Sequence, residues 1–95
     1  MFIIDITYKV ELEVVDQYLP AHVDYLKKQY ANHFFLLSGK KVPRTGGIIL
    51  SHLKDKNRLL AILKDDPFYA HDLADYRITE FLPSMSTAEL ATFKG

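Results

Sequence analysis

The sequence predicts an α+β fold of the ferredoxin-like type, in which a four-stranded antiparallel sheet carries two helices on one face. Three observations lead to this prediction. Segments with strand-like and helix-like spacing of apolar residues follow one another in the order β-α-β-β-α-β. The 95 residues suffice for one domain, but only with a thin core. The composition, 48% apolar and 25% charged, is that of an ordinary folded protein.

The first two predicted elements are a strand and a helix. Residues 2–8 place β-branched and aromatic side chains in alternation, which predicts a strand with one buried face. Residues 10–15 are ambiguous, and we treat them as a connection. Asp16 is then a candidate N-cap for a helix that has Pro20 near its first turn and ends at about Asn32, which tolerates a left-handed conformation. The helical stripe expected to face the core consists of Leu19, Val23, Leu26 and Tyr30.

A hairpin is predicted in the middle of the chain. Residues 34–38 and 48–53 are short apolar runs typical of buried strands, and the glycine-containing loop 39–47 joins them. This loop is either a solvated hairpin tip or a lid that attracts an anionic substrate. Its cationic side chains are Lys40, Lys41 and Arg44.

A second helix and a fourth strand complete the pattern. Asp55 is a candidate N-cap for a helix over residues 56–64, and Pro67 disfavours helix at the residue before it. Residues 67–72 are expected to form one further short turn, and residues 76–82 alternate as a strand. The side chains expected to point inward from the second helix are Leu59, Leu60, Ile62 and Leu63.

The sheet has one face that the helices do not cover. Apolar groups on that face, such as Ile3 and Phe81, need a partner surface. We therefore expect a homodimer that packs sheet against sheet. Residues 1–95 are expected to form a single domain whose core ends near residue 83, with a tail at 84–95 in which Ser86 is a candidate helix cap.

Charge and composition exclude several classes of function. Twelve Lys and Arg balance twelve Asp and Glu, so there is no basic excess for binding nucleic acid. Cysteine is absent, which removes disulfides, thiol catalysis and Cys-based zinc sites and fits the reducing cytoplasm. No apolar run is long enough to span a membrane, and the N-terminal segment, interrupted by Asp5, is typical of a strand rather than a signal peptide.

His22 is the first candidate for chemistry. It lies at the edge of the predicted apolar stripe, between Tyr18 at i−4 and Tyr25 at i+3. A histidine in this position can act as a general acid or base. It can equally be a boundary residue that hydrogen-bonds to a backbone carbonyl or water. Helical geometry leaves both interpretations open.

Asp66 is the second candidate, and it too has two interpretations. It precedes Pro67 where a helical turn begins, so it can be an N-cap, or it can orient an imidazole. A carboxylate has enough lone pairs for both. His71 follows closely enough to approach the same pocket. The spacing of His33, His52 and His71 does not match a helical metal site, so no metal is expected.

Four short motifs, in a set order and spacing, carry a resemblance that extends over residues 2–82. They are Pro20-Ala21-His22, Leu36-Leu37-Ser38-Gly39, Asp65-Asp66-Pro67-Phe68, and Ala74-Asp75-Tyr76-Arg77-Ile78 with Glu80-Phe81. Together they resemble the YCII (YciI-like) family. The resemblance implies a dimeric α+β barrel, related to muconolactone isomerases and small cofactor-free monooxygenases.

The resemblance also implies a site and a type of reaction. The family site combines a histidine of the first helix with the aspartate of the Asp-Pro-Phe motif, here His22 and Asp66. The implied chemistry is lyase- or isomerase-like and includes removal of chloride from small cyclic substrates. This chain departs from the family where Lys40 follows Gly39 in place of a proline, and where Asp72 replaces a glycine.

The sequence thus leads to two functional hypotheses. In the first, a small cofactor-free enzyme uses His22, oriented by Asp66, to take a proton from a small cyclic or anionic molecule. In the second, the same dimer binds a small ligand or a protein partner without turnover. The side chains expected to line the pocket are Tyr18, Tyr25, Gly39, Phe68 and His71.

Overall fold

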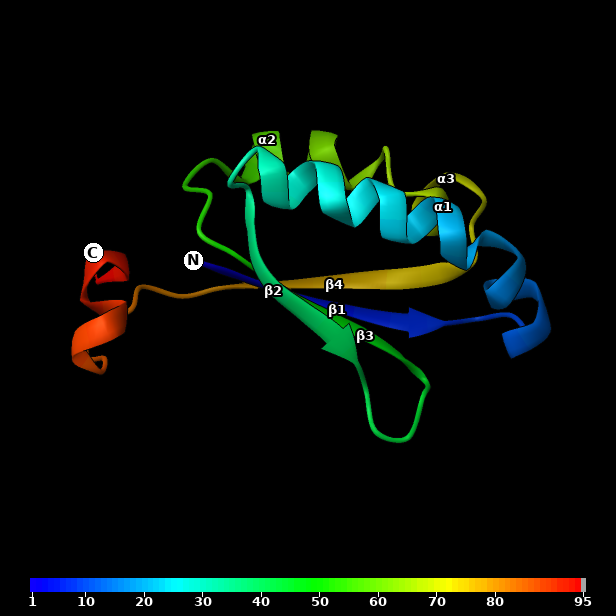
Figure 1. Ribbon diagram of the computed structural model, residues 1–95, viewed down its shortest axis with the longest axis horizontal. Coiled ribbons are helices and arrows are strands. Elements are labelled where there is room, and N and C mark those ends of the chain that lie inside the picture. Colours follow the sequence, from blue (N-terminus) through cyan, green and yellow to red (C-terminus); the bar gives the residue numbers. More distant parts are fainter. Residues whose placement is uncertain (95) are drawn as a thin grey trace.

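A four-stranded antiparallel sheet with the strand order β2-β3-β1-β4 forms the base of the molecule, and the α-helices lie on one of its faces (Figure 1). The computed structural model describes residues 1–94. This architecture confirms the predicted α+β ferredoxin-like fold. The elements are β1 (Phe2–Tyr8), α1 (Leu12–Ala31), β2 (Phe35–Lys40), β3 (Gly46–Ser51), α2 (Lys56–Leu63), α3 (Pro67–Ala70), β4 (Ala74–Glu80) and the 3₁₀ helix η1 (Ala88–Phe93).

The core lies between the sheet and the helices, and β1 supplies its centre. Phe2, Ile4 and Ile6 are at most 2% exposed and face the helices, whereas the residues between them face away. Ile4 lies opposite Ile49 of β3 in the register of the sheet. Burying each such side chain contributes about 1.5–3 kcal/mol, which fixes the face of β1 that turns inward.

Helix α1 begins earlier than the sequence predicted. Glu11, in an extended conformation, is its N-cap, so the segment expected to be a connection is helical. Val15 in that segment is completely buried, which explains why the helix extends this far. Asp16 is not a cap, and its carboxylate instead binds Arg44. At the other end, the left-handed residue is His33 (φ 61°) rather than Asn32.

The buried face of α1 also differs from the predicted stripe. Its buried residues are Val15, His22, Tyr25 and Gln29. The stripe expected in the core is only half-buried at Leu19 and Leu26, and Val23 is 38% exposed. The physical reason is a polar contact, because this orientation of α1 brings His22 to the buried carboxylate of Asp66. The apolar stripe is left facing the space beside the hairpin.

The hairpin strands are shifted relative to the prediction, and the connection between them is shorter. β2 continues to Lys40 and β3 starts at Gly46, so five residues connect them. Gly46 tolerates no side chain, because a Cβ there would lie 1.7 Å from the Ile6 carbonyl oxygen. This close approach holds the hairpin against β1.

The second half of the chain follows the prediction more closely. Asp55 caps α2, accepting hydrogen bonds from the backbone N–H groups of Asn57 (2.9 Å) and Arg58 (3.4 Å). The prediction for Leu60 was wrong, since it is 37% exposed on the outer side of α2. Asp72 adopts the left-handed conformation (φ 56°) that the turn before β4 needs.

The chain after β4 leaves the body of the molecule. Figure 1 shows this tail extending beyond the end of the sheet, with η1 near the C-terminus. Thr87, not Ser86, is the N-cap of η1, and the Ser86 hydroxyl donates to the carbonyl of Thr87 instead of accepting from a helix N–H. Among residues 1–94, no helix has the length and apolar character needed to cross a membrane.

Candidate active site

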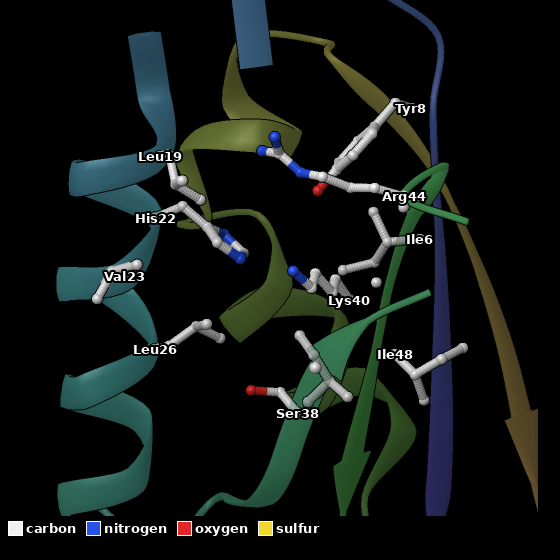
Figure 2. Close-up of a pocket in the computed structure, with 14 residues that line it drawn as sticks. Ile6, Tyr8, Leu19, His22, Val23, Leu26, Ser38, Lys40, Arg44 and Ile48 are labelled. Atoms are coloured by element: carbon white, nitrogen blue, oxygen red, sulfur yellow. The ribbon is translucent and has the colours of Figure 1, made fainter. Parts of the chain in front are cut away.

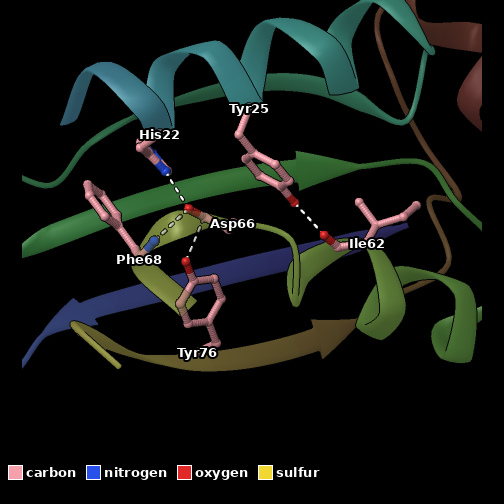
Figure 3. A network of polar contacts seen from close by, with 6 residues as sticks. All are labelled: His22, Tyr25, Ile62, Asp66, Phe68 and Tyr76. Carbon is pink, nitrogen blue, oxygen red and sulfur yellow. Dashed lines mark hydrogen bonds and ion pairs between the residues drawn. The ribbon is translucent and has the colours of Figure 1, made fainter. Parts of the chain in front are cut away.

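The carboxylate of Asp66 is the centre of a buried polar network (Figure 3). Asp66 is the N-cap of α3, where Pro67 takes the first helical position. Its Oδ1 accepts a hydrogen bond from the backbone N–H of Phe68 at 3.0 Å, and the same oxygen lies 2.8 Å from Nδ1 of His22. Its Oδ2 accepts a hydrogen bond from the hydroxyl of Tyr76 at 2.6 Å. One carboxylate therefore caps a helix and holds an imidazole.

His22 reaches this carboxylate from the buried face of α1. Its ring stacks on Phe68, with 4.0 Å between the ring centroids and 9° between the planes. An ionised carboxylate can only accept, so the neutral imidazole carries its hydrogen on Nδ1. Nε2 then keeps a lone pair. Figure 2 shows the ring extending from α1 into a cavity, so a base is available there.

Tyr76 is a member of the site that the sequence analysis did not identify. Burial raises the pKa of its phenol above the usual range, and the negative charge of Asp66 and the hydrogen bond to it raise the pKa further. The phenol therefore stays protonated and donates to Asp66. The alternation of β4 was the available signal, because Tyr76 lies opposite Ile6 and shares its inward face.

A cavity of about 400 Å³ opens between α1 and the β2–β3 hairpin (Figure 2). Residues of α1 and the strands form its apolar wall, so the stripe displaced from the core has become the side of a pocket. These apolar residues are Ile6, Leu19, Val23, Leu26, Ile48 and Ile49. The polar side chains of the lining are Tyr8, His22, Ser38, Lys40 and Arg44.

The structure brings some of the predicted site residues together. His22 and Asp66 are in direct contact, and Phe68 stacks on the His22 ring but is not part of the cavity lining. Gly39 lines the cavity. The contact between His22 and Asp66 joins residues that are 44 positions apart in the sequence.

Other predicted pocket residues lie outside the lining of this cavity. Tyr25 is in the core, where its hydroxyl donates to the carbonyl of Ile62 at 2.9 Å and burial raises the pKa of the phenol. Tyr18 packs on His71, with 4.4 Å between their ring centroids. The rotation of α1 explains both positions: when His22 turns inward, its neighbours one turn away face the core and α3 instead.

Charges at the cavity mouth are partly paired. Arg44 of the β2–β3 loop donates a hydrogen bond to Asp16 of α1 at 2.5 Å, and this contact lowers the pKa of the Asp16 carboxyl. It also ties the loop to the helix across the mouth. Within residues 1–94, no three His, Asp or Glu side chains converge in a way that could hold a metal ion.

Comparisons with known proteins agree with this architecture. The family model of the YCII-related domain matches residues 1–82. A solved structure with a similar fold is 5-chloro-2-hydroxyhydroquinone dehydrochlorinase from Burkholderia phenoliruptrix AC1100, in complex with 2,5-dihydroxybenzoquinone. The two share 18% identity and a TM-score of 0.74, over 84% of this chain and 91% of the dehydrochlorinase chain. At this identity the similarity shows the fold. No curated protein matches the sequence significantly.

Proposed function

The chain belongs to the YCII-related family, as its motifs predict. We propose that it is a small-molecule enzyme in which His22 and Asp66 perform general acid–base chemistry. One observation carries the proposal: the 2.8 Å contact between His22 Nδ1 and a completely buried carboxylate, at the wall of a cavity. A pairing of this kind orients the ring and stabilises the imidazolium that forms when Nε2 takes a proton.

The proposed reaction begins with proton transfer. Nε2 of His22 removes a proton from a C–H or O–H group of the bound molecule, and Asp66 stabilises the resulting imidazolium through Nδ1–H. If the imidazolium returns the proton to a different carbon, the product is an isomer. If a chloride ion leaves instead, the net reaction is loss of HCl. Such proton transfer contributes typically ~10²–10⁴-fold in rate, and it needs no cofactor.

Two features support a small cyclic substrate. The cavity of about 400 Å³ is of the size that encloses a single small molecule. The structural neighbour is a dehydrochlorinase whose structure contains a dihydroxybenzoquinone, a small oxygenated ring. Both features favour a lyase- or isomerase-type reaction on a small ring.

The competing interpretation assigns the network to stability and ligand binding alone. Asp66 caps α3 in any case, so its burial by itself does not require catalysis. In this interpretation the cavity holds a ligand without turnover. The two interpretations differ in what happens when His22 is removed.

The test is turnover across a panel of chlorinated hydroquinones and small lactones, followed by chloride release and by deuterium incorporation from D2O. For a molecule that wild-type protein converts, we expect His22→Ala to lose ~10²–10⁴-fold in rate and Asp66→Asn to lose a comparable factor. His33→Asn is the matched control, because it removes an exposed histidine at the end of α1 and asparagine tolerates the left-handed backbone. Full activity in both site variants would exclude the dyad.

We further propose that two copies associate through the uncovered face of the sheet. Leu37 and Leu50 are cross-strand partners on that face, and they line an apolar hollow of about 420 Å³ together with Phe81 and the tail. Apolar side chains next to the hollow are strongly exposed, with Leu82 at 78% and Met85 at 89%. A hollow and protruding apolar side chains on the same surface suit a twofold contact, in which the protruding side chains of each copy enter the hollow of the other. The net charge of zero means that two copies do not repel each other.

A further inference from the structure

Strand alternation places Lys40 on the same side of the sheet as His22. Lys40 lies opposite Gly47, and Gly47 lies opposite Ile6, which faces the helices. Lys40 therefore points inward, and it lines the same cavity as His22. Figure 2 shows its side chain extending towards the His22 ring. The neighbouring Lys41 alternates to the opposite face.

Lys40 differs from Lys41 and Arg44 in its ion-pair partners. Lys41 lies 2.6 Å from Asp5 and donates a hydrogen bond to the Thr7 hydroxyl at 3.0 Å, both on the uncovered face. Arg44 is paired with Asp16, so its charge is locally compensated. Among the residues that the structure describes, none forms an ion pair with Lys40. Among Lys40, Lys41 and Arg44, Lys40 is thus the cation that is available to a ligand.

The cavity lining favours negative charge. It contains the side chains of Lys40, Arg44 and His22 but no Asp or Glu. The carboxylate of Asp66 lies behind the imidazole, engaged by three donors. Lys40 itself is exposed, so its attraction for an anion at the cavity is screened by salt.

We propose that Lys40 binds a permanently anionic group of the substrate, and that the substrate class is small ring compounds that carry a carboxylate. The carboxylate contacts the Lys40 ammonium, the ring packs on Leu19 and Leu26, and the reacting atom lies at Nε2 of His22. This inference rests on the proposed function for the same site. It makes Lys40 a determinant of specificity for this chain.

The test compares two probes of nearly equal shape, benzoate and benzamide, by isothermal titration calorimetry at low ionic strength. We expect wild-type protein to bind benzoate at least tenfold more tightly than benzamide. Lys40→Gln removes the charge, so it should abolish this preference while leaving the affinity for benzamide unchanged. Lys40→Arg should retain the preference, and added salt should weaken it.

Lys27→Gln is the matched control, because it makes the same change of charge on the exposed side of α1, outside the cavity. It should leave the preference for benzoate intact. Equal affinities for the two probes, failure of benzoate to bind, or an unchanged preference in Lys40→Gln would overturn the proposal.

Failure of this inference can be told apart from failure of the proposed function, since probe binding involves no proton transfer. His22→Ala with full turnover would contradict acid–base catalysis while the preference for benzoate in wild-type protein still supported the anion site. Loss of that preference, with turnover still dependent on His22, would overturn the anion site alone.

Discussion

At the scale of single residues, Asp66 satisfies two demands that the sequence presents as alternatives. Its Oδ1 accepts from both the Phe68 N–H and His22, which leaves Oδ2 for Tyr76. The Asp-Pro pair was readable as a cap because capping is a local property of the chain. The residues alone allow Asp66 to orient an imidazole, and the family resemblance pairs it with His22. Tyr76 was missed, because its contact depends on the register of β4 in the sheet.

The buried phenol of Tyr76 gives a prediction about alkaline pH. Its pKa is raised in the folded state, so the folded protein holds this proton more tightly than the unfolded chain does. The resulting stability is fully present below about pH 10 and declines as the pH rises towards the folded-state pKa. Above about pH 10, the free energy of unfolding of Tyr76→Phe should therefore fall less steeply with pH than that of wild-type protein. The difference in slope should be about 1.4 kcal/mol per pH unit.

Urea unfolding of both proteins between neutral pH and pH 11 measures this slope. At neutral pH the variant should lose about 1.5–3 kcal/mol, the value of a hydrogen bond to a charged group. An identical alkaline slope in the two proteins would show that Tyr76 is not buried against Asp66.

At the scale of elements, α1 shows why a helical wheel can predict a helix and miss its buried face. Its apolar spacing correctly indicated a helix, but the wheel ranks residues by hydrophobicity alone. The wheel therefore could not anticipate that a buried carboxylate on α3 would draw His22 inward. Val15, assigned to a connection, became a core residue that packs with Phe68. The misplaced stripe was still informative, since it now forms the cavity wall.

The orientation of α1 is tested by one substitution made at two positions. Val15→Ala removes two buried methyl groups from a side chain with 0% exposure, and it should cost about 2–3 kcal/mol of stability. Val23→Ala makes the same change at a position that is 38% exposed, and its cost should stay within about 0.5 kcal/mol. Chemical unfolding of both variants gives the comparison. A larger loss of stability in Val23→Ala than in Val15→Ala would show that the face predicted by the helical wheel is the buried one.

At the scale of the whole molecule, the order of elements was predictable and their contacts were less so. The β-α-β-β-α-β order follows from periodicities within each segment and fixes the fold class. The cavity depends on contacts between distant segments, such as Gly46 against the Ile6 carbonyl and Arg44 against Asp16. No local pattern encodes these contacts. The sequence places Lys40 in a basic loop, and only its position in β2 distinguishes it from Lys41.

The proposed dimer is tested by sedimentation equilibrium. Wild-type protein should have the mass of two chains, and Leu37→Glu should have the mass of one, because it places a charge in the apolar hollow at a side chain that is 59% exposed. Leu60→Glu, the same change at a 37% exposed leucine on the helical side, should leave the dimer intact. A monomeric wild-type protein, or a dimeric Leu37→Glu variant, would contradict this assembly.

The central claim is that Asp66 holds the hydrogen of the neutral imidazole on Nδ1, so that Nε2 of His22 presents a lone pair to the cavity. Long-range ¹H–¹⁵N correlation NMR identifies the tautomer directly and needs no substrate. With the imidazole neutral, wild-type protein should show a protonated Nδ1 and an unprotonated Nε2 at His22. The opposite tautomer, with hydrogen on Nε2, would leave no base facing the cavity and would contradict the account.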